Sequence, residues 1–206
     1  MCCVVVDHLT NSLPHLRDLF LQLSPISLPI KKNVPLPFAI TEIVVSQMLS
    51  GSSAKVIFSR ILEETDRRHA SAPWRLSETE LAACGISRRK AFAIVSFGNH
   101  FEEDPTNFES WSDLEHEALV LEVSKFWGLS RWSADILALS YFGSPDVFPM
   151  SDGTLNRAIK AAIAHTSVPF NEWSIEAASP YRSYLARYLW KSIDTGYWNT
   201  SAKSFG

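Results

Sequence analysis

The segment that decides the fold runs from Val123 to Ala134 and reads VSKFWGLSRWSA. At its centre, Gly128, Leu129 and Ser130 separate two stretches of helical composition. Glycine readily supplies the positive φ angle of a tight turn, and serine is favoured just before the first turn of a helix. The pattern therefore predicts a hairpin of two helices whose turn is held to the core by Leu129.

Such a hairpin leaves the first N–H groups of its second helix without partners inside the helix. These groups form a site for an anion, and a nucleic-acid phosphate suits it. A plain corner between two helices, with no ligand, has the same sequence pattern. The segment Leu81–Ala91, LAACGISRRKA, repeats the design, and in both segments an alanine stands four positions after the serine.

The remaining elements are predicted from apolar spacing and from residues that start or stop helices. Residues 25–37 contain four prolines and form a connector, because proline cannot continue a helix. The first ten residues form either a short strand or a tail. No pair of strands is apparent, so we predict an all-α fold. Helices are expected at about 13–23, 38–49, 54–62, 78–84, 88–94, 113–125, 131–141, 153–164 and 181–193.

The composition is that of a globular protein. The chain has 206 residues, of which 46% are hydrophobic and 20% charged, and its net charge is −3. These values exclude a collagen, a disulfide-rich miniprotein and a wholly disordered chain. They also argue against a protein that holds nucleic acid by bulk positive charge, although a few cations on one face would suffice.

Targeting and metal signals are lacking in the sequence. The three cysteines, Cys2, Cys3 and Cys84, form no spaced framework, which indicates a reducing compartment and no zinc or iron–sulfur site. The apolar opening MCCVVV has no basic start, so we expect no signal peptide. No run of about 18 apolar residues occurs, so we expect no membrane association. We expect a cytoplasmic protein, associated with the nucleoid in a bacterium or located in the nucleus of a eukaryote.

Four stretches resemble the helix-hairpin-helix–GPD superfamily of DNA glycosylases, and within it the 3-methyladenine DNA glycosylase II (AlkA) branch. They occur in the family's order over about residues 37–192. Pro37-Phe38 with SQMLS at 46–50 resembles the family's "PF … GQQLS", and Cys84–Ala91 resembles "GLSxxKA". The hairpin with DVFPMSD at 146–152 resembles "LPGIGxWTA … DVFPxxD", and PYRSYLARYLW at 180–190 resembles "PWRSYAxxYLW".

The resemblance implies two helical lobes with a helix-hairpin-helix motif and an active-site cleft between them. Residues 38–142 would form the central lobe that carries the hairpin. Residues 1–37 and 143–206 would form the second lobe, and the N-terminal β domain of the larger members has no counterpart here.

The resemblance makes Asp152 the candidate catalytic residue. A carboxylate beside the sugar stabilises the oxocarbenium-like state through which the N-glycosidic bond breaks. Asp152 precedes a predicted helix, whose dipole favours the charged form of the side chain. An aspartate at this position is also a common helix N-cap with no other role.

Aromatic residues would form the base pocket. Trp132 stands where superfamily members that also nick the strand carry a lysine nucleophile, so this chain is expected to have no lyase activity. Trp190 matches the tryptophan that faces the flipped base, and two indoles suit an electron-poor alkylated purine. Ile136 and Tyr181 are expected to line the same region. Alternatively, both tryptophans are core residues.

The resemblance also assigns residues that contact DNA. Met48 falls where the family places a wedge that fills the gap left by the flipped nucleotide, and Gln47 could touch the orphaned base. Met48 is otherwise a core methionine, and Gln47 the cap of a turn. Phosphate contacts are expected from Gly128, Ser130 and Arg131 of the hairpin, and from Arg88, Arg89 and Lys90, which otherwise form a solvated helix face.

The hairpin departs from the family pattern. The usual Pro-Gly-apolar-Gly turn is here Trp127-Gly128-Leu129-Ser130, so a serine side chain stands where a phosphate would approach. The family often holds a monovalent cation on hairpin carbonyls. Those carbonyls would belong to Ser124, Phe126 and Leu129. The changed turn leaves it undecided whether this chain keeps the cation site. No other cofactor is expected to be required.

These features favour a monofunctional DNA glycosylase that excises alkylated purines of the 3-methyladenine or 7-methylguanine type by base flipping. Its partner would be double-stranded DNA containing damaged bases, and we expect a monomer. Two other functions fit the same sequence. One is a glycosylase for deaminated or mismatched bases, and the other is a non-catalytic helix-hairpin-helix DNA-binding protein.

Overall fold

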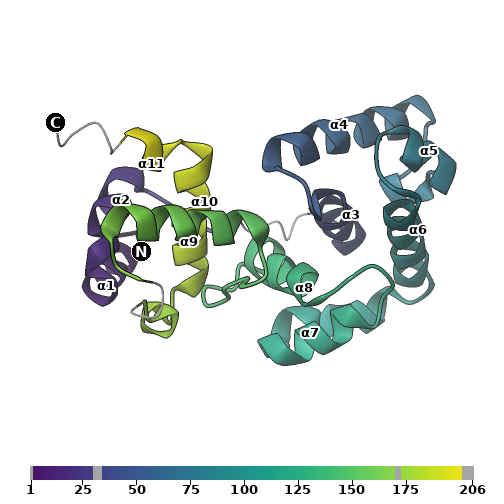
Figure 1. Cartoon of the computed structure of the whole chain (residues 1–206). Coiled ribbons are helices and arrows are strands. Elements are labelled where there is room, and N and C mark those ends of the chain that lie inside the picture. The colour runs from purple at the N-terminus through teal and green to yellow at the C-terminus, as the bar shows by residue number, and fades with distance from the viewer. Residues whose placement is uncertain (1, 30–33, 170–172, 201–206) are drawn as a thin grey trace. The chain divides into compact units, whose positions relative to one another are not determined.

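The computed structural model describes residues 2–29, 34–169 and 173–200 (Figure 1). All regular secondary structure in this part of the chain is helical, and it contains no strand. The all-α prediction is therefore confirmed. None of the helices in the described ranges has the length and apolar character that crossing a membrane requires.

The chain forms two compact units. The central unit comprises residues 30–142, and the terminal unit comprises residues 1–29 and 143–206. Residues 34–37, which the sequence places with the terminal segments, lie in the central unit. The reason is local: helix α3 begins at Leu36, and the N–H of Phe38 donates to the carbonyl of Pro35 at 2.9 Å.

In the central unit, α3 (Leu36–Ser46) contacts α4, α6 and α8. It is apolar on nearly every side, as expected of a helix surrounded by others. Short 3₁₀ segments precede α5 and α7, and a π-helical turn follows α8. The bounds are α4 Gly51–Arg67, η2 Pro73–Arg75, α5 Glu78–Ala83, α6 Arg88–Glu103, η3 Pro105–Asp113, α7 His116–Ser124, α8 Arg131–Leu137 and η4 Ala138–Phe142.

An aromatic cluster forms the core beside the hairpin. Phe97 of α6 packs against Phe108 of η3 and Phe126 of the turn after α7, with ring centroids 5.4 and 5.0 Å apart. Trp111 lies 5.0 Å from Phe108 in the same cluster. These large rings fix the end of α7 against α6.

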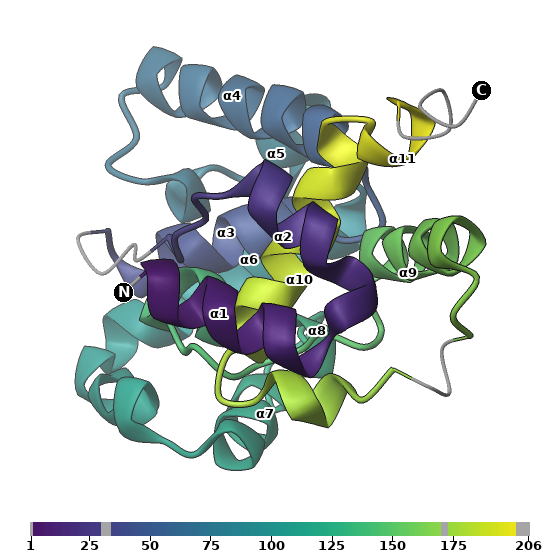
Figure 2. The same ribbon diagram turned by 90° about the vertical axis from the view of Figure 1, so that its left-hand side faces the viewer.

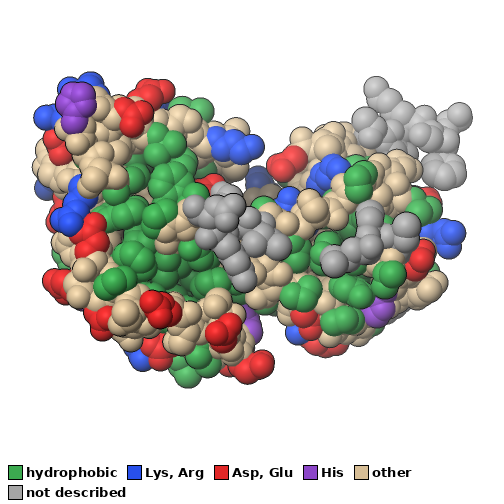
Figure 3. All heavy atoms as spheres, turned by 180° about the vertical axis from the view of Figure 1, so that it is seen from behind, with side chains coloured by type: hydrophobic (Ala, Val, Ile, Leu, Met, Phe, Trp, Pro, Cys, Tyr) green, Lys and Arg blue, Asp and Glu red, His purple; other side chains and the backbone are tan. Residues whose placement is uncertain are grey.

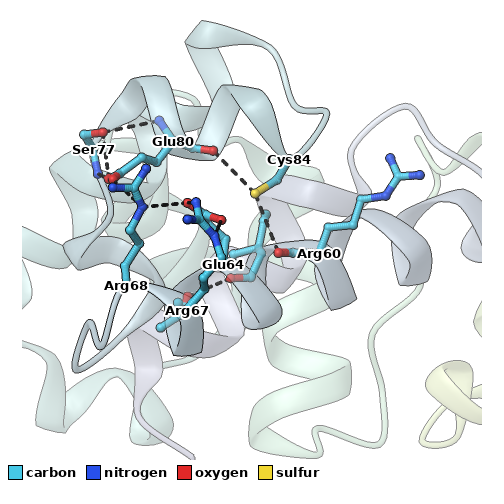
Figure 4. Close-up of polar contacts among 9 residues, drawn as sticks. Arg60, Glu64, Arg67, Arg68, Ser77, Glu80 and Cys84 are labelled. Carbon is cyan, nitrogen blue, oxygen red and sulfur yellow. Dashed lines mark hydrogen bonds and ion pairs between the residues drawn. The ribbon is translucent and has the colours of Figure 1, made fainter.

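Ion pairs join α4 to α5 on the other side of the unit (Figure 4). Glu64 accepts hydrogen bonds from Arg67 and Arg68, and Arg68 also pairs with Glu80 at 3.0 Å. The pKa of Glu64 is lowered, chiefly by the hydrogen bond from Arg67. Cys84, whose pKa is raised by burial, points its thiol at the carbonyl of Arg60. These contacts join α4 to α5 at this corner of the unit.

The terminal unit combines helices from the N-terminal and C-terminal segments of the chain (Figure 2). Phe20 of α2 packs edge-on against Tyr188 of α10, and the Tyr188 hydroxyl bonds to Ser24 Oγ at 2.7 Å. Lys191 donates to the carbonyl of Leu23 at 2.8 Å. The bounds are α1 Cys2–Ser12, η1 Pro14–Leu16, α2 Arg17–Leu23, α9 Gly153–Thr166, η6 Ile175–Ala178, α10 Arg182–Asp194 and α11 Tyr197–Thr200.

Several elements differ from the sequence prediction, and α4 and α6 are both longer than expected. The first residues form helix α1 rather than a strand or tail, because Val5 and Leu9 are both buried against the unit. Helix α3 ends at Ser46 instead of continuing to Leu49, since Met48 has a left-handed backbone. Helix α7 begins at His116, because the residues that follow Pro105 take the 3₁₀ form.

Candidate active site

The turn between α7 and α8 has the predicted geometry. Gly128 has a φ of +78°, and a Cβ atom built on it would lie 2.8 Å from the Cβ of Ala93 in α6. Glycine is therefore required here both for its backbone conformation and for the close approach to α6. Leu129 is buried and anchors the turn, as expected. The other hairpin matches it, since Gly85 has a φ of +111° and Ser87 caps α6.

Ser130 causes no strain in this turn. Its φ of −147° and ψ of 179° are extended backbone that any residue adopts. Its N–H donates to the Oγ of Ser133 at 3.3 Å. The replacement of the family's second glycine by serine therefore leaves the backbone of the hairpin intact.

Arg131, a predicted phosphate ligand, is paired with a carboxylate. Its guanidinium donates two hydrogen bonds to Glu117 of α7, at 2.9 and 2.5 Å. These bonds raise the pKa of Arg131 and lower that of Glu117. Both side chains are exposed, so the pair is of the weak surface type. A phosphate would have to compete with Glu117 for Arg131.

Lys90, also predicted to contact phosphate, points into the unit instead. Its Nζ donates to the carbonyl of Val45 at 2.9 Å and to that of Gln47 at 2.7 Å. Burial lowers the pKa of this ammonium group. Its neighbours Arg88 and Arg89 are exposed in the first turn of α6, and neither forms a salt bridge with another described residue. These two arginines stay the candidates for phosphate contact.

Met48 projects fully into solvent between α3 and α4. Its relative exposure is 101%, and its φ is +58°, an unusual value for a residue other than glycine. The alternative of a core methionine is therefore excluded. Gln47 beside it is engaged within the protein: its Nε2 donates to the carbonyl of Gly128 at 2.8 Å and to Ser133 Oγ at 3.3 Å. The predicted contact of Gln47 with an orphaned base would require these bonds to break.

Asp152 is the N-cap of α9, and it is nearly buried, with 9% exposure. Its Oδ1 accepts hydrogen bonds from the N–H of Leu155 at 2.7 Å and from the indole Nε1 of Trp190 at 2.9 Å. The carboxylate is thus held in one orientation by two N–H donors from α9 and α10. The predicted helix-cap role is present, and an indole donor that the sequence did not indicate is added to it.

The loop that leads to Asp152 is clamped by the start of α10. Asp146 accepts two hydrogen bonds from the guanidinium of Arg182, at 2.8 and 3.0 Å, and a third from Ser179 Oγ. Burial raises the pKa of Asp146, but these hydrogen bonds outweigh it and place the pKa below its ordinary value. Ser183 Oγ donates toward the carbonyl of Ser144 at 2.7 Å. The PYRSY motif therefore has a clear structural purpose, which is to hold the loop before Asp152.

The other predicted pocket residues are half-buried. Trp132 and Ile136 lie one turn apart on α8 of the central unit. Tyr181 is the N-cap of α10 in the terminal unit, with its ring edge-on to His8 at a centroid distance of 5.2 Å. Whether these residues and Trp190 line one pocket for a base stays a prediction.

The cation site also stays a prediction. Of the three candidate carbonyls, that of Phe126 accepts a hydrogen bond from the N–H of Leu129 at 3.1 Å, so the turn itself uses part of its capacity. Among the described residues, no group of three or more His, Cys, Asp or Glu side chains is arranged to hold a metal ion.

Sequence reasoning missed a buried carboxylate in the hairpin. Asp135 of α8 is 3% exposed, and its Oδ1 bonds to Nε2 of His116 in α7 at 2.9 Å. The bond fixes the second helix of the hairpin against the first. The two residues are 19 positions apart in the chain, so no local spacing indicates that they meet.

The central unit also has an apolar groove of about 540 Å³. Hydrophobic side chains gather on the face of this unit that Figure 3 shows. The hydroxyl of Tyr141 donates to the carbonyl of Val34 in the groove, and burial raises the pKa of Tyr141. The groove is lined by Val34, Pro35, Leu36, Phe101, Pro105, Phe108, Glu109, Ser112, Tyr141 and Phe142. None of the predicted site residues lies in it.

Comparison with known proteins gives related sequences. No protein-family model matches the chain. DNA-3-methyladenine glycosylase 1 of Schizosaccharomyces pombe is 25% identical over 157 residues, which cover 72% of this chain and 68% of that protein. The alkylbase DNA glycosidase-like protein mag2 of the same yeast is 27% identical over 158 residues, covering 72% and 73% of the two chains.

Solved structures agree in fold. The S. pombe 3-methyladenine DNA glycosylase in complex with abasic DNA has a TM-score of 0.75 at 21% identity, over 92% of this chain and 96% of that one. The 3-methyladenine DNA glycosylase of Archaeoglobus fulgidus has a TM-score of 0.73 at 18% identity, over 94% and 70%. In sequence this chain is similar to proteins named as 3-methyladenine or alkylbase DNA glycosylases, and in fold it is similar to solved 3-methyladenine DNA glycosylases.

Proposed function

We propose that this protein is a monofunctional DNA glycosylase that excises alkylated purines of the 3-methyladenine or 7-methylguanine type. The observation that carries the proposal is the geometry of Asp152, a nearly buried carboxylate held by the N–H of Leu155 and the indole of Trp190. Relatives named as 3-methyladenine glycosylases, one of them in a complex with abasic DNA, support DNA as the partner and alkylated bases as the target.

Asp152 would act on the sugar of the damaged nucleotide. The N-glycosidic bond breaks through an oxocarbenium-like state, and a fixed carboxylate stabilises the positive charge that develops on the sugar. Such a carboxylate is most effective when it needs no reorganisation during the reaction. The two N–H donors on Oδ1 supply that orientation, and the clamp of Arg182 on Asp146 supports the loop behind it.

The base would be selected by aromatic contact. An alkylated purine carries positive charge on its ring, which strengthens its attraction to an indole face. Trp132 and Trp190 are both half-buried, so neither residue is fully enclosed in the core. Because Trp132 stands where a Schiff-base lysine would be, the product is an intact strand with an abasic site.

Base flipping requires a side chain that fills the vacated space. Met48 suits this task, because it is apolar, flexible and fully exposed. Arg88 and Arg89 would contribute phosphate contacts at the start of α6. We propose that the protein acts as a monomer at the cell's DNA, in the nucleoid or the nucleus according to the organism.

Base release tests the proposal directly. Purified protein is incubated with DNA methylated to contain 3-methyladenine and 7-methylguanine, and released bases are separated by chromatography. Release by the wild type, and its loss in Asp152→Asn, is the expected result. Duplexes with hypoxanthine or a mismatched base form the second arm. Release from those alone would indicate the deaminated-base alternative, and binding to damaged DNA without any release would indicate a non-catalytic protein.

A further inference from the structure

Two side chains connect the Met48 turn to the α7–α8 turn within the central unit. Lys90 of α6 donates to the carbonyls of Val45 and Gln47, at 2.9 and 2.7 Å. Gln47 in turn donates from its side-chain amide to the carbonyl of Gly128, at 2.8 Å. We call this chain of contacts the Lys90–Gln47 strut.

The strut solves a local problem at the end of α3. The last carbonyls of a helix have no partner inside the helix and carry partial negative charge. The ammonium group of Lys90 donates hydrogen bonds to two carbonyls at this end, that of Val45 inside the helix and that of Gln47 just after it. Lys90 is half-buried, and hydrogen bonds to these carbonyls replace part of the hydration that its ammonium group loses on burial.

The residue that follows is the strained one. Met48 has a φ of +58°, and its side chain is fully exposed, so no burial of that side chain stabilises the conformation. A residue other than glycine stays in this conformation only where its surroundings determine it. Here the surroundings are the hydrogen-bonded Gln47 before Met48 and the start of α4 at Gly51 after it.

We propose that Lys90 and Gln47 are positioning residues for nucleotide flipping, and that they set the place of Met48 relative to the hairpin turn instead of binding DNA themselves. This inference rests on the proposed function. If the hairpin holds the DNA backbone, Gln47 links the Met48 turn directly to that holding point through the carbonyl of Gly128. Loss of the strut should then impair insertion of Met48 much more than binding of the duplex.

The first test does not depend on activity. Amide hydrogen exchange is measured on wild type, Lys90→Met and Gln47→Leu, with Lys55→Met as a matched control at an exposed lysine of α4. We expect faster exchange at residues 45–50 in the first two variants and no change there in Lys55→Met. Unchanged exchange at 45–50 in Lys90→Met would show that the strut does not hold the turn, and would overturn the inference whatever the protein's activity.

The second test separates positioning from DNA binding. Flipping is followed by 2-aminopurine fluorescence in a duplex that carries the probe beside a lesion analogue, in an Asp152→Asn background so that no base is removed. We expect Lys90→Met to slow flipping by about 10- to 100-fold, since misplacement by about 1 Å has effects of this size. Its affinity for undamaged duplex should change less than about threefold, and Lys90→Arg should recover part of the rate.

A phosphate role for Lys90 would give a different result. Lys90→Met would then weaken binding to every duplex alike, and the slope of log K against log salt would become shallower by about 0.9 for the lost contact. That outcome would overturn the positioning role of Lys90. Absence of base release by the wild type would count against the proposed function alone, because exchange at 45–50 and 2-aminopurine fluorescence are measured without it.

Discussion

The indole Nε1 of Trp190 donates a hydrogen bond of 2.9 Å to Oδ1 of Asp152, across 38 residues of sequence. The tryptophan predicted to face the base thus also orients the carboxylate predicted to act on the sugar. A change at Trp190 therefore affects two parts of the site, and the choice of substitution decides which part is tested.

Trp190→Phe should reduce the single-turnover rate of base release by about tenfold or more. The substitution keeps an aromatic ring and removes the hydrogen bond to a charged group, which contributes on the order of 2 kcal/mol. Quenched-flow measurement of base release gives the rate. Trp198→Phe is the matched control, because it removes an indole donor to Ser192 Oγ at 2.7 Å in the same unit. Equal rates of base release for wild type and Trp190→Phe would show that the indole N–H does not contribute to catalysis.

Two substitutions at Asp152 should separate catalysis from helix capping. Asparagine is as good an N-cap as aspartate, so Asp152→Asn should keep the stability of α9 while lowering base release by about 100-fold or more. Asp152→Ala removes the cap as well and should lower the free energy of unfolding by about 1 kcal/mol further. Urea denaturation beside an excision assay tests both. An active Asp152→Asn protein would remove Asp152 from the mechanism.

The hairpin turn should tolerate change at Ser130 but not at Gly128. Gly128→Ala adds a Cβ at a φ of +78° and 2.8 Å from Ala93, so it should destabilise the protein by about 1 kcal/mol or more. Ser130→Gly should leave duplex affinity unchanged or improve it, because glycine also adopts this extended backbone and removes the side chain from the expected path of a phosphate. Thermal denaturation and duplex titration are the measurements.

A double substitution checks the cause of the Gly128 effect. Ala93→Gly removes the atom that the new Cβ would meet, so Gly128→Ala combined with Ala93→Gly should cost less than the two single changes together. Additive losses would mean that the backbone angle alone is responsible. If Gly128→Ala were as stable as the wild type, neither reason for glycine would hold.

The clamp on Asp146 predicts a loss of stability in acid. Its pKa lies below the ordinary aspartate value of about 3.9, so the folded state holds the charged form more tightly than the unfolded state does. The contribution of Asp146 is complete above that ordinary value and is lost as the pH falls below it. Urea midpoints between pH 7 and pH 2.5 should therefore fall less steeply for Asp146→Asn than for the wild type. Parallel curves would contradict the assignment.

The reaction should leave an uncut strand. Trp132 cannot form a Schiff base, so borohydride should trap no covalent complex between the protein and damaged DNA. Cleavage of the product by hot alkali would reveal the abasic site, and Trp132→Lys offers a comparison in which an amine stands at the same position. Trapping of the wild type would show that a lysine elsewhere acts as the nucleophile.

Local signals in the sequence accounted for most of the helices and for several of their ends. Ser87 and Asp152 each cap a helix as predicted, and Gly85 and Gly128 each take a positive φ in a turn. Such signals depend on contacts between residues three or four positions apart, which a sequence displays directly. The order of four family-like stretches then indicated the fold and the candidate carboxylate.

The uses of individual polar side chains depended on tertiary structure. Lys90 has the same place in the sequence pattern as its exposed neighbours Arg88 and Arg89, yet only Lys90 reaches the end of α3, 43 residues away. Arg131 meets Glu117, and Trp190 meets Asp152, for the same reason. A cation or an indole N–H bonds to whichever acceptor the packing of helices brings near, and that packing is settled by burial of apolar faces over the whole chain. Sequence alone thus determined most of the helices, several of their caps and the family likeness, and only the packed structure decided which charged groups pair within the protein and which stay exposed.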